Sequence, residues 1–269
     1  MRHPNGLRAA SGAVGGWTLA NAVYSGVSFS VSLEDNTPQG LFFRSDGAKM
    51  YMVGSSLDNI NEYTLSTPWN ISTASYIRSF FVRTQNLVPT GVFFKEDGTK
   101  MYMAGNTASN INEYDLSTAW NISTASYLRT FSFSGQDSNA QDIYFRDGGA
   151  KLYMVGSTGN AVYEYTLSTP WNISTASFVQ SASVSSQDTD PTGLFFKPNG
   201  AKMFIVGTSG DDVYEYNLTT AWDISTLSFV RSFPVDVQES NPTGLFFKAD
   251  GNSMYVVGTN AKTVFAYNL

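Results

Sequence analysis

The sequence contains no cysteine and a single histidine, and each absence excludes a class of function. Without cysteine, the chain forms no disulfide, no thiolate metal site and no cysteine nucleophile. The one histidine, His3, lies in a polar N-terminal stretch, which leaves neither a histidine-based triad nor a histidine-rich metal site. We therefore expect no cofactor and no metal.

Charge is also scarce, and long apolar runs are missing. Charged residues occupy 14% of the 269 positions, and the net charge of −6 has the wrong sign for a nucleic-acid-binding surface. No run approaches the roughly 18 apolar residues that a membrane-spanning helix needs. The sequence thus predicts a protein that binds neither nucleic acid nor membrane, and aromatic residues, at 14%, are its abundant component.

An internal repeat dominates the chain. The segment 40–51 recurs with starts at 91, 142, 193 and 244, so that successive copies begin 51 residues apart. A second marker, Trp-Asn-Ile-Ser-Thr-Ala-Ser, begins at Trp69, Trp120 and Trp171, with a variant at Trp222, and has the same spacing. A fixed period of about 50 residues is typical of β-propeller blades.

Each copy predicts four short strands. In the second copy these are 90–95, 100–104, 110–116 and 127–133. An Asp-Gly pair joins the first two, which is a strong hairpin signal because glycine tolerates the positive φ of such turns. With no helical period anywhere, the sequence predicts an all-β, five-bladed β-propeller with four antiparallel strands in each blade.

The two ends of the chain predict how the ring closes. The last copy stops at Leu269, after its third strand, and the stretch that begins at Trp17 matches the missing fourth strand. We expect this N-terminal strand to complete the last blade, because a closed ring leaves no unpaired sheet edge. The predicted propeller spans 17–269, with a flexible, glycine-rich N-terminal arm at 1–16. One extra residue is present at the join, since Trp17 to Gly40 is 23 positions and Trp69 to Gly91 is 22.

The blade pattern resembles known propeller families. The run Pro-Thr-Gly-Leu-Phe-Phe-Lys-Pro-Asn-Gly-Ala-Lys-Met-Phe-Ile-Val at 191–206 is similar to YVTN and NHL-type blades, and the shared closing strand resembles that of WD-repeat proteins. The near-identical copies also look like tandem repeats of phage structural proteins and bacterial surface proteins. The first resemblance implies the propeller fold, while the second implies a virion or a bacterial cell surface.

The repeated tryptophans allow two interpretations. Trp69, Trp120, Trp171 and Trp222 could form a multivalent sugar-binding surface, as the repeated sites of lectins resembling the tachylectins do. The alternative is that each indole packs inside its blade, which is the usual role of a residue present in every copy. Exposed rings would favour the lectin, and buried rings would favour a scaffold.

Basic residues gather on the expected face of the first hairpin turns. The repeated lysines Lys49, Lys100, Lys151 and Lys202 are candidates for docking a partner. The N-terminal arm adds three more candidates, Arg2, His3 and Arg8. Acidic residues collect in the connections of the opposite face, so the sequence predicts a disc with two differently charged faces.

The carboxylates do not form a catalytic pattern. Glu62, Glu113, Glu164 and Glu215 repeat in the third strand, away from the channel, and four equivalent acids are not a differentiated acid–base pair. Asp188 and Asp190 suggest at most a weak calcium site, for which a polar loop is the alternative.

The sequence therefore predicts a non-enzymatic structural or binding module. The leading hypothesis is a phage virion protein, a capsid decoration or tail-associated protein, that docks onto a protein partner through its arm and one face. The alternative is a carbohydrate-binding adhesin that recognises host-surface glycans, extracellular or on a bacterial surface. A propeller glycosidase or lyase is the third hypothesis.

Overall fold

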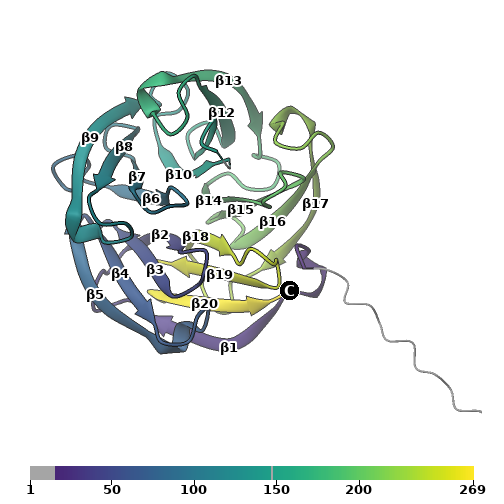
Figure 1. Ribbon diagram of the computed structural model, residues 1–269. Helices are drawn as coiled ribbons and strands as arrows, with labels where there is room; N and C mark the ends of the chain where they lie inside the picture. Colours follow the sequence, from purple (N-terminus) through teal and green to yellow (C-terminus); the bar gives the residue numbers. More distant parts are fainter. Residues whose placement is uncertain (1–15, 147) are drawn as a thin grey trace, which may run out of the picture.

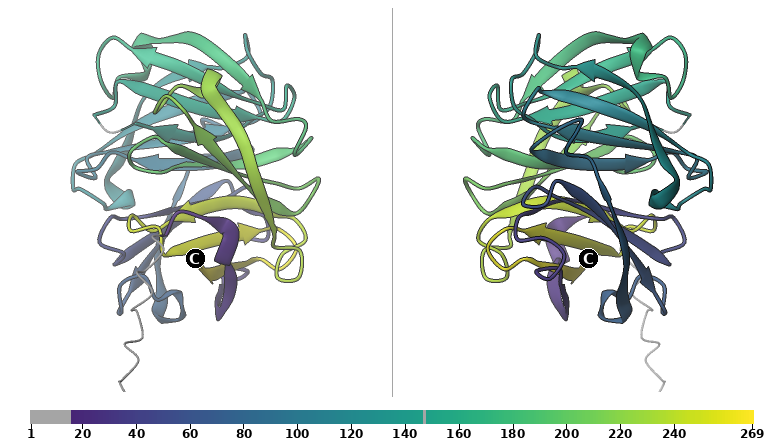
Figure 2. Two further views of the ribbon diagram at one scale, coloured as in Figure 1. Left: turned by 90° about the vertical axis from the view of Figure 1, so that its right-hand side faces the viewer. Right: turned by 90° about the vertical axis from the view of Figure 1, so that its left-hand side faces the viewer.

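Each copy of the repeat forms one four-stranded antiparallel sheet, and five such sheets surround a central axis (Figure 1). The structure is a computed structural model that describes residues 16–146 and 148–269. It confirms the predicted all-β, five-bladed propeller. Seen from the sides, turns and connections project from the two faces of the ring (Figure 2).

Blades one to five are numbered by their first strands. Blade one contains β2 (Pro38–Phe43), β3 (Lys49–Gly54), β4 (Asn59–Leu65) and β5 (Ala74–Phe81). Blade two contains β6 (Pro89–Phe94), β7 (Lys100–Gly105), β8 (Asn110–Leu116) and β9 (Ala125–Ser132). Blade three contains β10 (Ala140–Phe145), β11 (Lys151–Gly156), β12 (Ala161–Leu167) and β13 (Ala176–Ser183). Blade four contains β14 (Pro191–Phe196), β15 (Lys202–Gly207), β16 (Asp212–Leu218) and β17 (Leu227–Pro234).

Blade five closes the ring with both ends of the chain. It contains β18 (Pro242–Phe247), β19 (Ser253–Gly258) and β20 (Thr263–Asn268), and its outermost strand is β1 (Val23–Ser30). The extra residue at this join is absorbed in a bulge, where the register jumps from Tyr24 opposite Tyr267 to Ser28 opposite Phe265. Gly26 lies in that bulge at φ +81°, a conformation that glycine adopts without steric cost.

Short 3-10 turns precede the fourth strands. They are η1 (Leu19–Asn21), η2 (Ile71–Thr73), η3 (Ile122–Thr124), η4 (Ile173–Thr175) and η5 (Ile224–Thr226). The side chain before each turn caps it, as Asn70 Oδ1 does by accepting the Ser72 N–H at 3.2 Å. The Asn-Ile-Ser-Thr runs thus supply their own caps, since short polar side chains accept hydrogen bonds from nearby backbone N–H groups.

The core lies between neighbouring sheets. Each of five buried clusters combines residues of adjacent blades, for example Tyr102 of β7 with Phe145 of β10. The first strands surround the axis and contact one another around the ring. A substitution in a first strand therefore acts on the central channel.

Candidate functional site: the central channel

A closed ring of aromatic side chains constricts the central channel. Each first strand contributes one residue: Phe42, Phe93, Tyr144, Phe195 and Phe246. Neighbouring rings pack edge to face, with centroids 5.2 to 5.5 Å apart around the whole circle. Because this is a favoured geometry for aromatic pairs, the five side chains hold one another in place.

An apolar funnel opens above this ring, on the face of the first hairpin turns. It has a volume of about 190 Å³ and lies over the aromatic ring, with Trp69 and Trp120 in its wall. Ser45, Glu96, Pro198 and Ala249 reach it from four of the five hairpin turns. The funnel is therefore a hollow on the propeller axis that opens on this face, and its lining is mainly apolar.

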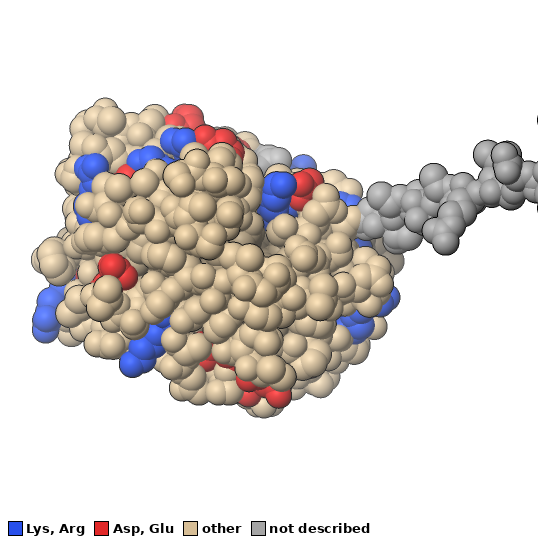
Figure 3. Space-filling view, turned by 90° about the horizontal axis from the view of Figure 1, so that it is seen from below, with Lys and Arg blue, Asp and Glu red and all other residues tan. Residues whose placement is uncertain are grey.

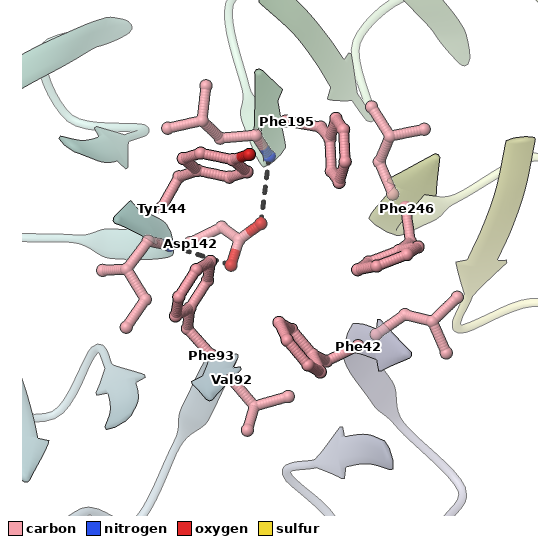
Figure 4. Close-up of a pocket in the computed structure, with 11 residues that line it drawn as sticks. Phe42, Val92, Phe93, Asp142, Tyr144, Phe195 and Phe246 are labelled. Carbon is pink, nitrogen blue, oxygen red and sulfur yellow. Dashed lines mark hydrogen bonds between the residues drawn. The ribbon is translucent and has the colours of Figure 1, made fainter. Parts of the chain in front are cut away.

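A single carboxylate lies beside the aromatic ring. Asp142 starts the third copy where the other four copies have glycine, and Figure 4 shows its side chain directed into the channel. Its Oδ2 accepts the Leu194 N–H of blade four at 3.0 Å, and its Oδ1 accepts the Ile143 N–H at 2.8 Å. The side chain thereby links β10 to β14.

The space around Asp142 is small. The cavity that it lines has a volume of about 20 Å³, enough for roughly one water molecule. A Cβ built on Gly91 would lie 2.5 Å from Asp142 Oδ1, so glycine at position 91 is what leaves room for the carboxylate. Burial raises the pKa of Asp142 to about 7, although its two backbone N–H partners favour the charged form.

The far end of the channel is polar and lined by threonine and glutamine. Thr90 and Thr192 donate to backbone carbonyls of the next blade, those of Ala140 and Pro242. Gln39 and Gln141, at the same position of their copies, instead donate to serines in their own blades. The channel therefore has an apolar end and a polar end, separated by the aromatic ring and Asp142.

Asp142 was missed by the sequence analysis, although the repeat carries a signal for it. Aligning the five starts gives Gly40, Gly91, Asp142, Gly193 and Gly244, and the aspartate is the departure. Four copies have glycine at this position and the third has an acidic residue, which marks the third copy as different there. Only the structure shows that this position faces the axis.

The repeated tryptophans pack between blades. Trp171 and Trp222 are buried, whereas Trp69 and Trp120 are partly buried. Each indole lies against the glycine of a hairpin turn, such as Gly47 against Trp69. Aromatic neighbours cover the indole faces. The ring of Phe43, for instance, stacks on Trp69 with 5.6 Å between the two ring centroids. By the criterion stated above, this burial favours a scaffold over stacking of sugar rings on the indoles.

The repeated lysines are engaged in ion pairs. Lys49, Lys100, Lys151 and Lys202 pair with Glu62, Glu113, Glu164 and Glu215, all of which are buried. Each lysine ammonium group therefore pairs with a buried carboxylate and is not free to bind a partner's acidic group. Arg2, His3 and Arg8 lie outside the described residues.

The acidic connections of the opposite face are largely structural. Asp188 accepts the N–H of Asp190 at 2.7 Å and the N–H of Gly210 at 3.1 Å, which ties two loops together. Asp35 and Asp137 do the same in their copies. Among residues 16–146 and 148–269, no group of three or more histidine, aspartate or glutamate side chains is arranged to hold a metal ion. No helix in this part of the chain is long and apolar enough to span a bilayer.

Comparison with known proteins supports the fold alone. No protein-family model matches the chain, and no curated protein matches it. A solved structure of a protein proposed to be a 6-phosphogluconolactonase, from Bacteroides uniformis, is similar with a TM-score of 0.52 and 12% identity, over 83% of this chain and 64% of that one. The chain thus spans less than two thirds of that protein. The β-propeller domain of Myceliophteria thermophila Cps50 (Swd1) matches with a TM-score of 0.49 and 8% identity, over 86% and 69% of the two chains.

Proposed function

We propose that the chain is a non-catalytic binding module that docks a protein partner at the apolar funnel of its hairpin face. One observation carries this proposal: among the described residues, the lining of the funnel is mainly aromatic and apolar, with Glu96 as its one acidic member. A hollow of this kind suits an apolar side chain or segment of a partner.

The settings of two carboxylates support the non-enzymatic part. Asp142 lies in a cavity of about 20 Å³, too small for a substrate, and Glu113 is ion-paired. Catalysis by carboxylates needs groups that reach the reacting atoms and differ in pKa. We expect no acceleration of 6-phosphogluconolactone hydrolysis over background. An acceleration that Asp142→Asn abolished would overturn this part of the proposal.

What supports the virion setting is the resemblance of the repeats to those of phage structural proteins. In this setting the N-terminal arm and the hairpin face act together, because Gly16 lies against Gly251 in a hairpin turn of that face. The described chain therefore begins at the same hairpin turn that contributes Ala249 to the funnel.

The test is capture of virion proteins from a lysate of producing cells, with two matched surface variants. Ala249→Arg places a charged side chain at the funnel margin, and Val237→Arg adds the same charge on the opposite face, where Val237 is exposed. We expect Ala249→Arg to lose the partner and Val237→Arg to retain it. Deletion of 1–15 should weaken capture. Equal capture by all variants would refute docking through the arm and this face.

A further inference from the structure

Four of the five junctions between neighbouring blades contain the same polar cluster. In each, the third-strand glutamate pairs with a second-strand lysine, and a fourth-strand arginine or glutamine lies beside it. At the junction of blades one and two, Lys49 also donates to the Trp120 carbonyl at 3.0 Å. Arg78 donates to Asn121 Oδ1 at 2.6 Å, and Glu62 accepts the Ile122 N–H at 3.3 Å. The cluster thus serves three polar groups of the next blade.

The fifth junction, where blade five meets blade one, lacks the whole cluster; we call it the seam. Ser253 stands in place of the lysine, Ala266 in place of the glutamate, and the bulge at Gly26 and Val27 in place of the arginine. One contact is kept, the hydrogen bond from Tyr255 OH to the Trp69 carbonyl at 2.8 Å. What remains is a hollow of about 230 Å³.

The seam hollow keeps the polar groups of blade one that the cluster serves elsewhere. They are the Trp69 carbonyl, whose counterpart on Trp120 accepts from Lys49 as a second donor, and Asn70 Oδ1, whose counterpart on Asn121 accepts from Arg78. The Ile71 N–H, whose counterpart donates to a glutamate, belongs to the next residue of the chain. At the seam, Asn70 Oδ1 accepts only from Ser72 within its own turn among the described residues. The hollow thus offers two acceptors in fixed positions, and the Ile71 amide follows them directly in the chain.

Among the described residues, no charged side chain lines this hollow. Its walls include Ser25, Trp69, Asn70, Ser253, Tyr255 and Ala266. Neither β1 nor β20 contains a charged residue. Figure 3 views this side of the ring and shows charged side chains in small separate groups with a broad uncharged surface between them. A charged ligand would lose its hydration here without gaining a counterion, so a neutral ligand is favoured.

We propose that the seam hollow binds one neutral polyhydroxylated ligand, a monosaccharide unit. Hydroxyl groups donate hydrogen bonds, so one sugar reaches the Trp69 carbonyl and Asn70 Oδ1 together, and the nearby Ile71 amide reports its binding. Both faces of the Trp69 indole are covered by other residues, so a sugar ring cannot stack on it. The sugar therefore binds through hydrogen bonds to the wall of the hollow. The hollow shares Trp69 with the wall of the funnel, but Ala249 does not line it, and the sugar proposal does not rest on the docking proposed above.

The test is a titration of the isotope-labelled full chain with D-glucose, D-galactose and N-acetyl-D-glucosamine, followed by amide NMR. We expect at least one of them to shift the Ile71 amide with a dissociation constant on the order of millimolar, which a ligand of this size reaches. Asn70→Ala should weaken binding several-fold, and Asn172→Ala, the same change at a filled junction, should leave it unchanged.

A second variant fills the hollow without disrupting the fold. Ser253→Lys with Ala266→Glu restores the lysine and glutamate of the other junctions and should weaken sugar binding at least tenfold, whereas Ala249→Arg should leave it intact. Three results would overturn the proposal: no sugar shifts the Ile71 amide, the filled variant binds equally well, or a zwitterionic amino acid such as glycine occupies the hollow in preference to all three sugars.

Discussion

At the channel axis, blade three adds a carboxylate, Asp142, where the other four blades have glycine; at the seam, blade five lacks the lysine and glutamate that the other four junctions contain. The added charge lies in a cavity of about 20 Å³ and accepts two backbone N–H groups. The lost charges leave a hollow of about 230 Å³. The departure from five-fold symmetry at Asp142 thus leaves only a small cavity, whereas the departure at the seam leaves a large hollow.

The difference shows how this ring handles buried charge. A carboxylate was added only where backbone donors face it, and at the seam the lysine and glutamate are both absent. Losing one partner alone would leave the other buried and uncompensated, which is far more costly than losing both. We therefore regard the seam as a coordinated replacement of the cluster by the chain-closing strand β1.

Removing β1 should have the largest effect on the stability of the ring, because the seam depends on this strand. Deletion of 1–31 removes β1 and Trp17, which leaves β20 as an open edge and uncovers Tyr267. Unpaired edges promote association between sheets. We expect loss of the cooperative thermal transition in circular dichroism, together with concentration-dependent oligomers in light scattering.

Deletion of 1–15 is the matched control, because it leaves every described residue in place. It should preserve the transition temperature. If the 1–31 deletion stayed monomeric with an unchanged transition, ring closure by β1 would not contribute to stability.

The charge at the axis should make stability depend on pH. The pKa of Asp142 rises from its ordinary 3.8 to about 7 on burial, so the folded chain binds more protons than the unfolded chain between these pH values. The free energy of unfolding therefore falls as pH rises through this window, and the effect is complete above about 7. At about 1.4 kcal/mol per pH unit the change amounts to about 4 kcal/mol.

Urea unfolding of the wild type and of Asp142→Gly, measured from pH 4 to pH 8, isolates this effect, because all other groups titrate in both proteins. The stability of the wild type should fall relative to the variant as pH rises. Asp142→Asn, which does not titrate, should follow the glycine variant in its pH dependence. Parallel curves for the wild type and both variants would show that the carboxylate does not titrate in this window.

The sequence alone predicted the fold because the repeat is so regular. The 51-residue period fixed the number of blades, and the third strand of blade two, 110–116, was predicted with the bounds that β8 has in the structure. The junction cluster was not predicted, since Lys49 lies opposite Thr64 in the ladder and reaches Glu62 diagonally. Its signal was present, because the lysine and the glutamate disappear together in the fifth copy, as Ser253 and Ala266.

Breaking one filled junction should be the next largest effect. Glu113→Ala removes the carboxylate that Lys100 and Arg129 share and the acceptor of the Ile173 N–H, while Lys100 keeps its pair with Asp115. Removing one partner of a buried pair typically costs 3–5 kcal/mol, and the partial exposure of these two cations places this case near about 3 kcal/mol. Urea unfolding measures the loss.

The double variant Lys100→Met with Glu113→Leu is the control, because it replaces the pair with apolar side chains of similar size. It should recover part of the loss of Glu113→Ala, because Arg129 and the Ile173 N–H still lack the carboxylate. At the seam, Ser253→Ala removes no ion pair and should change stability by less than about 0.5 kcal/mol. Equal losses for Glu113→Ala and Ser253→Ala would erase the distinction between filled and open junctions.

Filling the seam should have the smallest effect, and it tests whether the loss there was coordinated. Ala266→Glu alone adds a carboxylate without a cation and should destabilise the chain, whereas Ser253→Lys with Ala266→Glu should recover that loss and gain at most about 1 kcal/mol. In a double-mutant cycle by urea unfolding, this predicts a favourable coupling between positions 253 and 266. Additive effects would mean that the bulge at Gly26 has reshaped the junction, so that the hollow is no longer an unfilled copy of the other four.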